Sequence, residues 1–189
     1  IDAFIFTHEH SDHTAGLDDI RPYCYFNDFV MPLYAQPRVH ESFKKRFDYF
    51  FDFENRYPGA PNVSLIDVNE YKSFNIKDKQ ILPIAIAHGS LPILGYRMGN
   101  FAYITDAKFI NEQTIEAIKG VDVLVINTLR KEPHPSHLHL DLTLEYIEKI
   151  QPKRAYLTHI GFQLGLHEVV QKKLPNNVFL AYDNLIIEV

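Results

Sequence analysis

The sequence has a single cysteine and no long apolar run, and each shortage excludes a class of protein. Among its 189 residues only Cys24 carries a thiol, so no internal disulfide framework can form. A lone cysteine suits a reducing compartment, so we expect a cytoplasmic protein in which Cys24 is a small buried hydrophobic residue. No apolar run approaches the roughly 20 residues of a membrane span, so we expect no membrane partner.

Positive charge is also scarce. The formal net charge is −5, which argues against nucleic acid as a partner because nucleic-acid binding usually needs a basic face. The hydrophobic content of 46% and charged content of 23% are ordinary for a globular protein. The pattern shows no internal repeat, low-complexity segment or linker. We therefore predict a single domain over residues 1–189.

The segment Thr7–His13 carries the densest chemistry of the chain. Its potential metal ligands fall within six residues: His8, His10, Asp12 and His13. An apolar strand-like run, residues 3–6, precedes it, and a helix-like run, residues 15–20, follows and is expected to end at Pro22. Open α/β sheets carry functional groups where strands end. Imidazole and carboxylate ligands suit zinc, and also manganese or iron.

Three later polar residues repeat this arrangement. His88, Asp106 and His159 each follow an apolar strand-like run directly. Side chains at the carboxyl ends of neighbouring strands meet at one edge of a sheet. The sequence therefore predicts that these residues converge with the first cluster.

The remaining pattern alternates between strands and helices. Helices are predicted over residues 37–47, 111–119, 140–150 and 163–173. Gly99-Asn100, between two apolar runs, predicts a hairpin, and Asp183-Asn184 predicts a second one in residues 178–189.

An aromatic segment, Phe47 to Tyr57, allows two interpretations. Its rings continue the helical spacing of Phe43, which favours a packed helix face. The segment is also richer in aromatics than one face needs, which suggests a mobile flap or a homodimer contact. His40, on the preceding helix, has no evident partner in the sequence, and we expect it at the surface.

The run His-x-His-x-Asp-His after a strand resembles the signature of the metallo-β-lactamase superfamily. The resemblance implies an α/β fold, the αββα sandwich, and a metal-dependent hydrolase. Members of that family normally have several strands before this motif, whereas the motif here begins at His8. We therefore expect a domain that is N-terminally incomplete.

The resemblance also implies a ligand set for two divalent ions, zinc or manganese, with iron as a further option. In relatives the later ligands are His, Asp and His in this order. His8, His10 and His88 would hold one ion, Asp12, His13 and His159 the other, and Asp106 would bridge them. Two ions, two carboxylates and a bridging hydroxide leave a net charge of about +1, which suits a small anionic phosphate ester.

The loop 130–139 resembles that of the phosphodiesterase-like branch, close to the cyclic phosphodiesterase of phosphonate breakdown. There a histidine serves catalysis, and we carry this acid role onto His137, with His134 as second choice and His139 as a helix-start residue. The candidate catalytic residues are Asp12, His137 and His134. Two positions depart from relatives, which often have His at Phe162 and Gly at Asn184. His167 could partly replace the missing histidine.

These observations predict a dinuclear metal-dependent phosphodiesterase acting on a small or cyclic phosphate ester. A tRNA 3′-processing nuclease is an alternative, disfavoured by the acidic balance and the absence of a long substrate-binding arm. The oxygen-reducing di-iron branch has Glu where this chain has His10. A non-catalytic metal-stabilised interaction module is expected to lose ligands, and none is missing from the sequence.

Overall fold

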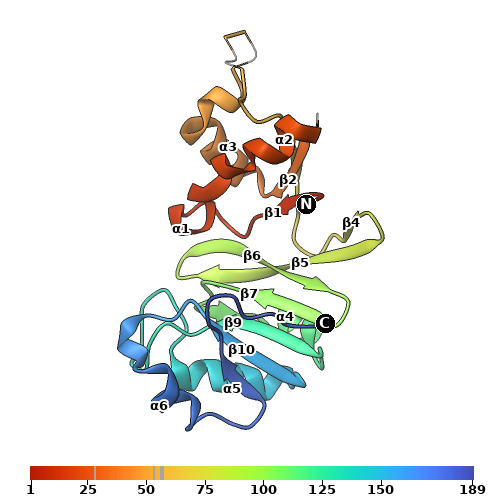
Figure 1. Cartoon of the computed structure of the whole chain (residues 1–189). Helices are drawn as coiled ribbons and strands as arrows, with labels where there is room; N and C mark the ends of the chain where they lie inside the picture. Colours follow the sequence, from red (N-terminus) through yellow and green to blue (C-terminus); the bar gives the residue numbers. More distant parts are fainter. Residues whose placement is uncertain (28, 53, 56–57) are drawn as a thin grey trace. The chain divides into compact units, whose positions relative to one another are not determined.

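The computed structural model describes residues 1–27, 29–52, 54–55 and 58–189 (Figure 1). The chain divides into two compact units, Ile1–Lys72 and Ser73–Val189. None of the described helices has both the length and the apolar character that crossing a membrane requires.

The first unit is a three-stranded parallel sheet with short helices. The strands lie in the order β1-β2-β3, and Phe4 and Ile5 of β1 pair with Leu33 and Tyr34 of β2. The elements in chain order are β1 (Phe4–Ile5), α1 (Ser11–Thr14), the 3-10 helix η1 (Ala15–Ile20), α2 (Arg21–Asn27), β2 (Met31–Ala35), α3 (Pro37–Arg46), the 3-10 helix η2 (Asp48–Phe50) and β3 (Val63–Asp67).

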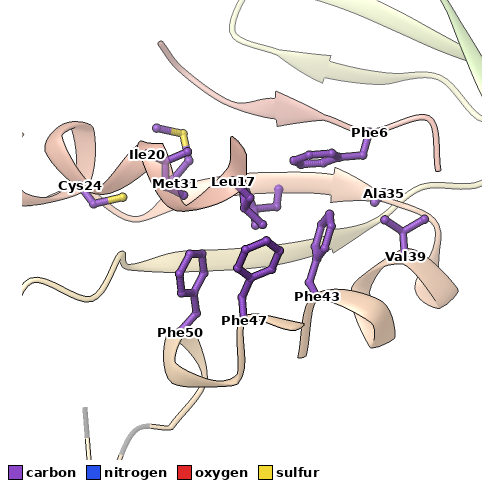
Figure 2. Packing of buried hydrophobic residues seen from close by; sticks show 11 residues of the cluster. Phe6, Leu17, Ile20, Cys24, Met31, Ala35, Val39, Phe43, Phe47 and Phe50 are labelled. Carbon is purple, nitrogen blue, oxygen red and sulfur yellow. The ribbon is translucent and has the colours of Figure 1, made fainter. Parts of the chain in front are cut away.

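Three phenylalanines on and after α3 form the centre of this unit's core. Phe43, Phe47 and Phe50 are at most 8% exposed (Figure 2). The ring of Phe47 lies 6.3 Å from that of Phe43 and 5.4 Å from that of Phe50. Phe6, at the end of β1, meets Phe43 edge to face at 4.8 Å. Since each buried ring contributes about 1.5–3 kcal/mol, this cluster holds the helix against the sheet.

The aromatic segment is therefore part of the core. The packed helix face is confirmed, and the prediction of a flap or subunit contact is wrong for Phe47 and Phe50, because their rings are buried in their own unit. Tyr49 and Phe51 pack against the same cluster. The predicted segment also includes Phe53 and Tyr57, which lie outside the described residues.

His40 corrects a second prediction, because it is only 3% exposed. Its Nδ1 lies 3.0 Å from a carboxylate oxygen of Asp67, and its Nε2 lies 3.2 Å from the carbonyl oxygen of Leu33. Both ring nitrogens thus face acceptors, which offsets the cost of burying a polar ring. Asp67 stands 27 residues away in the sequence, where no local pattern points to it.

Pro22 begins a helix instead of ending one. It is the second residue of α2, while residues 15–20 form the 3-10 helix η1. A helix tolerates proline in its first turn, because the backbone N–H groups there have no partner within the helix.

The second unit contains a mixed sheet of eight strands. Its order is β11-β10-β9-β7-β6-β5-β4, with β8 paired to β5. The elements are β4 (Phe74–Ile76), β5 (Lys79–His88), β6 (Leu91–Met98), β7 (Phe101–Ile104), β8 (Phe109–Ile110), α4 (Glu112–Ile118), β9 (Val123–Asn127), α5 (Leu140–Ile150), β10 (Arg154–Thr158), η3 (Phe162–Leu164), α6 (His167–Gln171) and β11 (Val178–Leu180).

The parallel and antiparallel parts of this sheet follow the sequence pattern. All five residues of β9 are buried, as a central strand between the parallel β7 and β10 requires. The hairpin predicted at Gly99-Asn100 joins the antiparallel β6 and β7. In α4, the side chain of Asn111 caps the helix by accepting a hydrogen bond from the backbone N–H of Thr114 at 2.7 Å.

Two predictions near the carboxyl end are corrected. The helix expected over 163–173 is reduced to η3 and α6, because Gly165, with φ 110°, separates them. The second hairpin does not form among the described residues. A turn at Asn184 (φ 67°) is present, but β11 pairs in parallel with β10 and residues 185–189 make no return strand.

Candidate metal centre

The first unit carries its four candidate ligands on the loop that leaves β1 and in α1, which follows it. The ring of His8 lies 4.6 Å from that of His10 and 4.4 Å from that of His13. His10 is the extended residue that precedes α1, and its carbonyl accepts the backbone N–H of His13 at 3.1 Å. This turn brings Asp12 beside His13, with Oδ2 and Nε2 3.2 Å apart.

Two arginines of α3 hold this loop in place. Arg38 donates to the Glu9 carboxylate at 2.7 Å. Arg46 donates to the Glu9 carbonyl at 3.0 Å and to the Thr14 hydroxyl oxygen at 2.6 Å. The Thr14 hydroxyl in turn donates to the carbonyl of His10 at 2.8 Å. The backbone between the histidines is therefore fixed by α3.

The second unit brings His88, Asp106 and His159 to strand ends. His88 is the last residue of β5, and Asp106 and His159 follow β7 and β10. Nε2 of His159 lies 3.2 Å from Oδ1 of Asp106, which also accepts a hydrogen bond from the hydroxyl of Thr105 at 2.9 Å. The sequence prediction of polar residues at strand ends holds within this unit.

The backbone at two of these ends is strained. Asp106 has φ 57° and His159 has φ 55°, in the left-handed region that residues with a side chain rarely adopt. Such conformations cost about 1–3 kcal/mol and cluster at functional sites. At these two residues the left-handed backbone changes the direction of the chain where each strand ends.

Asn127, which the sequence reasoning did not select, fixes the chain next to Asp106. Its side chain accepts from the backbone N–H of Ala107 at 2.7 Å and donates to the carbonyl of Ala107 at 3.0 Å. It is completely buried at the end of β9. The sequence feature that could have identified Asn127 is a single amide side chain at the end of an otherwise apolar strand.

The loop 130–137 places His137 among the ligands of this unit. Its ring lies 4.6 Å from that of His88, 5.0 Å from that of His159 and 5.0 Å from that of His134. Burial lowers the pKa of His137 to about 4, and the charges of the neighbouring histidines act in the same direction while Asp106 opposes them. The ring is therefore neutral at pH 7 when neither metal nor substrate is bound.

The other histidines take separate places. His134 lies one ring further out, and burial, Arg130 and Lys108 lower its pKa. His139 is the residue before α5, as predicted. His167 does not join the cluster, because its ring packs against Tyr182 at 6.1 Å.

A divalent ion fits the donors in each unit. Zinc bonds of about 2.0–2.1 Å at tetrahedral angles put two ligand atoms about 3.3 Å apart, and the Asp12–His13 and Asp106–His159 pairs are each separated by 3.2 Å. Nδ1 of His88 donates to the carbonyl of Ser136 at 2.8 Å, which fixes the orientation of the ring. Ligating histidines are typically held in this way.

The comparisons with known proteins decide the family. Residues 1–160 match the model described as the beta-lactamase superfamily domain. The chain belongs to this superfamily. A solved structure titled as a new diphosphatase from the PhnP family also matches. The two matches confirm the resemblance to the metallo-β-lactamase members and the α/β fold class, the metallo-β-lactamase fold. That structure is 34% identical, with a TM-score of 0.90 over 100% of this chain and 72% of its own.

Other superfamily structures show the fold alone. Zinc-bound PqqB from Methylobacterium extorquens is 17% identical, with a TM-score of 0.74 over 100% of this chain and 73% of its own. Human tRNase Z, short form, is 15% identical, with a TM-score of 0.69 over 100% of this chain and 79% of its own.

A curated relative has a different kind of name. An octanoyltransferase of Porphyromonas gingivalis is 37% identical over 186 residues, which are 98% of this chain. This chain spans only 37% of that relative's length. The His/Asp donors fit divalent ions, while the hydrolase activity and the convergence of all seven ligands at one centre stay predictions.

Proposed function

We propose that this superfamily member is a dinuclear metal-dependent phosphodiesterase that hydrolyses a small or cyclic phosphate ester. The observation that carries the proposal is its likeness to the diphosphatase of the PhnP family, at 34% identity over the whole chain. The ligand-bearing loop of the first unit and the strand ends of the second supply the donors that such a reaction needs.

In this proposal, His8, His10 and His88 would hold one ion, Asp12, His13 and His159 would hold the other, and Asp106 would serve both. When bound, a pair of divalent ions supplies an activated water and positive charge for the phosphate oxygens. Zinc and manganese are the proposed metals, with iron as the further option.

The protein's own groups then orient the ester and handle the proton of the leaving group. His137 is the candidate acid, because its ring lies within 5.0 Å of those of both His88 and His159 in the second unit. As the acid, His137 must carry a proton; burial lowers its pKa, and the negative charge of a bound phosphate would raise it. His134 is the second choice, one ring further from these ligands.

The experiment is a substrate panel on metal-reconstituted protein. The panel contains cyclic and linear phosphodiesters, a diphosphate ester and a precursor tRNA, with metal content measured in parallel. We expect hydrolysis of a small phosphodiester that disappears on chelation and returns with zinc or manganese. Cleavage of the precursor tRNA alone would contradict the proposal and favour the nuclease alternative. Metal binding with no hydrolysis would favour the interaction module.

A second candidate is an acyl thioester hydrolase, favoured by the name of the Porphyromonas gingivalis relative. Since 37% of that protein's length is matched, 63% lies outside the match, and the named transferase activity need not belong to the shared part. Octanoyl thioesters in the same panel distinguish the two candidates. Faster hydrolysis of the thioester than of every phosphodiester would make this the better assignment.

A further inference from the structure

A cavity of about 250 Å³ opens beside the candidate ligand His159 in the second unit. Its volume lies just below the roughly 300–1,000 Å³ of typical small-molecule sites, so it suits one part of a ligand rather than a whole one. The lining residues come from the end of β10 and from the segments that follow β10 and β11: Thr158, His159, Ile160, Ala181, Tyr182 and Asp183. A group bound in this cavity would therefore lie next to the ion or ligand that His159 helps to hold.

Tyr182 gives this cavity an aromatic wall. Tyr182 is 61% exposed, so the cavity side of its ring is open to a ligand. The ring of His167 meets it at 6.1 Å and an interplanar angle of 83°. His167 is itself held at the carbonyl of Leu180, 3.4 Å from Nε2, so it supports Tyr182 from a fixed position. An exposed and supported ring is a platform on which a flat group can stack.

The charges of the lining residues restrict what can bind. Asp183 is the acidic residue of the wall, and neither Lys nor Arg is among the residues that line it. A second phosphate would be repelled by this carboxylate, whereas sugar hydroxyls could donate hydrogen bonds to it. Ile160 and Ala181 add apolar surface next to the ring. The cavity therefore suits an uncharged group with a flat ring at one end and hydroxyl groups at the other.

We propose that this cavity binds the nucleoside of a nucleoside-containing phosphate ester, with the base on Tyr182, the sugar towards Asp183 and the phosphate at His159. This inference rests on the proposed function and names its substrate class. Stacking of one base on an aromatic side chain is strong enough to change affinity roughly 5- to 100-fold.

The test compares two substrates with the same leaving group, thymidine 5′-(4-nitrophenyl) phosphate and methyl 4-nitrophenyl phosphate. We expect Tyr182→Ala to raise KM for the thymidine ester roughly 5- to 100-fold and to leave KM for the methyl ester unchanged. Tyr182→Phe should keep the preference. The matched control is Phe109→Ala, which removes an exposed ring that lines a different cavity of the same unit. Binding of thymidine 5′-monophosphate is measured by equilibrium dialysis on metal-loaded protein. It should weaken in Tyr182→Ala but not in Tyr182→Phe or Phe109→Ala.

The outcomes separate the two proposals. If both esters are hydrolysed and Tyr182→Ala changes neither or changes both equally, the nucleoside site is wrong and the phosphodiesterase stands. If neither ester is hydrolysed but the monophosphate binds in a Tyr182-dependent manner, the site stands and the proposed reaction is wrong. If the protein neither hydrolyses the esters nor binds the monophosphate, both are wrong.

Discussion

At the scale of single residues, His137 carries the sharpest catalytic prediction. We expect His137→Ala to lower kcat on an unactivated phosphodiester by roughly 10²–10⁴-fold, the usual contribution of a general acid. The loss should be smaller for a nitrophenyl ester, because nitrophenolate leaves without a proton. Steady-state kinetics on both esters, with metal content as the control, measure this. Equal losses would indicate that His137 positions the substrate, and loss of metal would make it a ligand.

His40 carries the second prediction at this scale. His40→Ala should lower the free energy of unfolding by about 1–3 kcal/mol, because it removes a buried ring that contacts both the Leu33 carbonyl and the Asp67 carboxylate. Urea unfolding at neutral pH measures the change. The matched control is Lys44→Ala on the same helix, whose ion pair with Glu41 is exposed and should contribute little because solvent screens it. Equal effects of the two substitutions would contradict the role given to the buried contact.

At this scale, the sequence could predict only features that depend on residues close together in the chain. The seven candidate ligands were selectable, because four form one dense cluster and His88, Asp106 and His159 each directly follow a strand-like run. The residues that hold them were not. Asn127 acts on Ala107 and His40 acts on Asp67, and these partners are 20 and 27 residues apart. Only folding brings such groups into contact.

At the scale of elements, a polar network joins η1 and α2 to η2. Asp18 accepts hydrogen bonds from Tyr49 and from Arg21, the latter at 2.8 and 2.9 Å. Burial alone would raise the pKa of Asp18, but these hydrogen bonds outweigh it and hold the pKa below its ordinary value. A depressed carboxyl pKa stabilises the fold above the ordinary value of about 3.9, and this stability is lost as the pH falls through the folded-state pKa.

Tyr49→Phe should therefore destabilise the protein at pH 7 and have little effect in acid. The expected loss is below about 1 kcal/mol, because the side chain of Asp18 is 38% exposed and solvent screens the interaction. Urea unfolding of both proteins across the acid range measures the difference. Tyr25→Phe, at a site 72% exposed, is the control. A difference that grows as the pH falls would contradict the assignment.

Elements with strong local signals were predictable and those decided by pairing were not. The spacing of aromatic residues predicted α3, and Gly99-Asn100 predicted the β6–β7 hairpin. The second turn has the same kind of residues, yet β11 pairs in parallel with β10 instead. A turn sequence fixes a local bend, whereas the partner of a strand is set by the sheet that is already present. The left-handed backbone at Asp106 and His159 likewise has no sequence signature.

At the scale of the whole molecule, the two units supply different parts of the proposed centre. The first contributes a loop of closely spaced histidines, and the second contributes strand ends from three places in its sheet. The family match runs through both, from residue 1 to 160. Ions that bind only the folded state would stabilise it by mass action.

The most direct measurement of the central claim is a metal titration of the metal-free protein, followed by the rate of phosphodiester hydrolysis and by metal content. The claim is that His8, His10, Asp12, His13, His88, Asp106 and His159 form one two-metal hydrolytic centre. It predicts a rate that reaches its maximum at about two equivalents of zinc or manganese. Asp106→Asn should abolish hydrolysis and reduce metal retention. A maximum at one equivalent, or hydrolysis that survives Asp106→Asn, would contradict it.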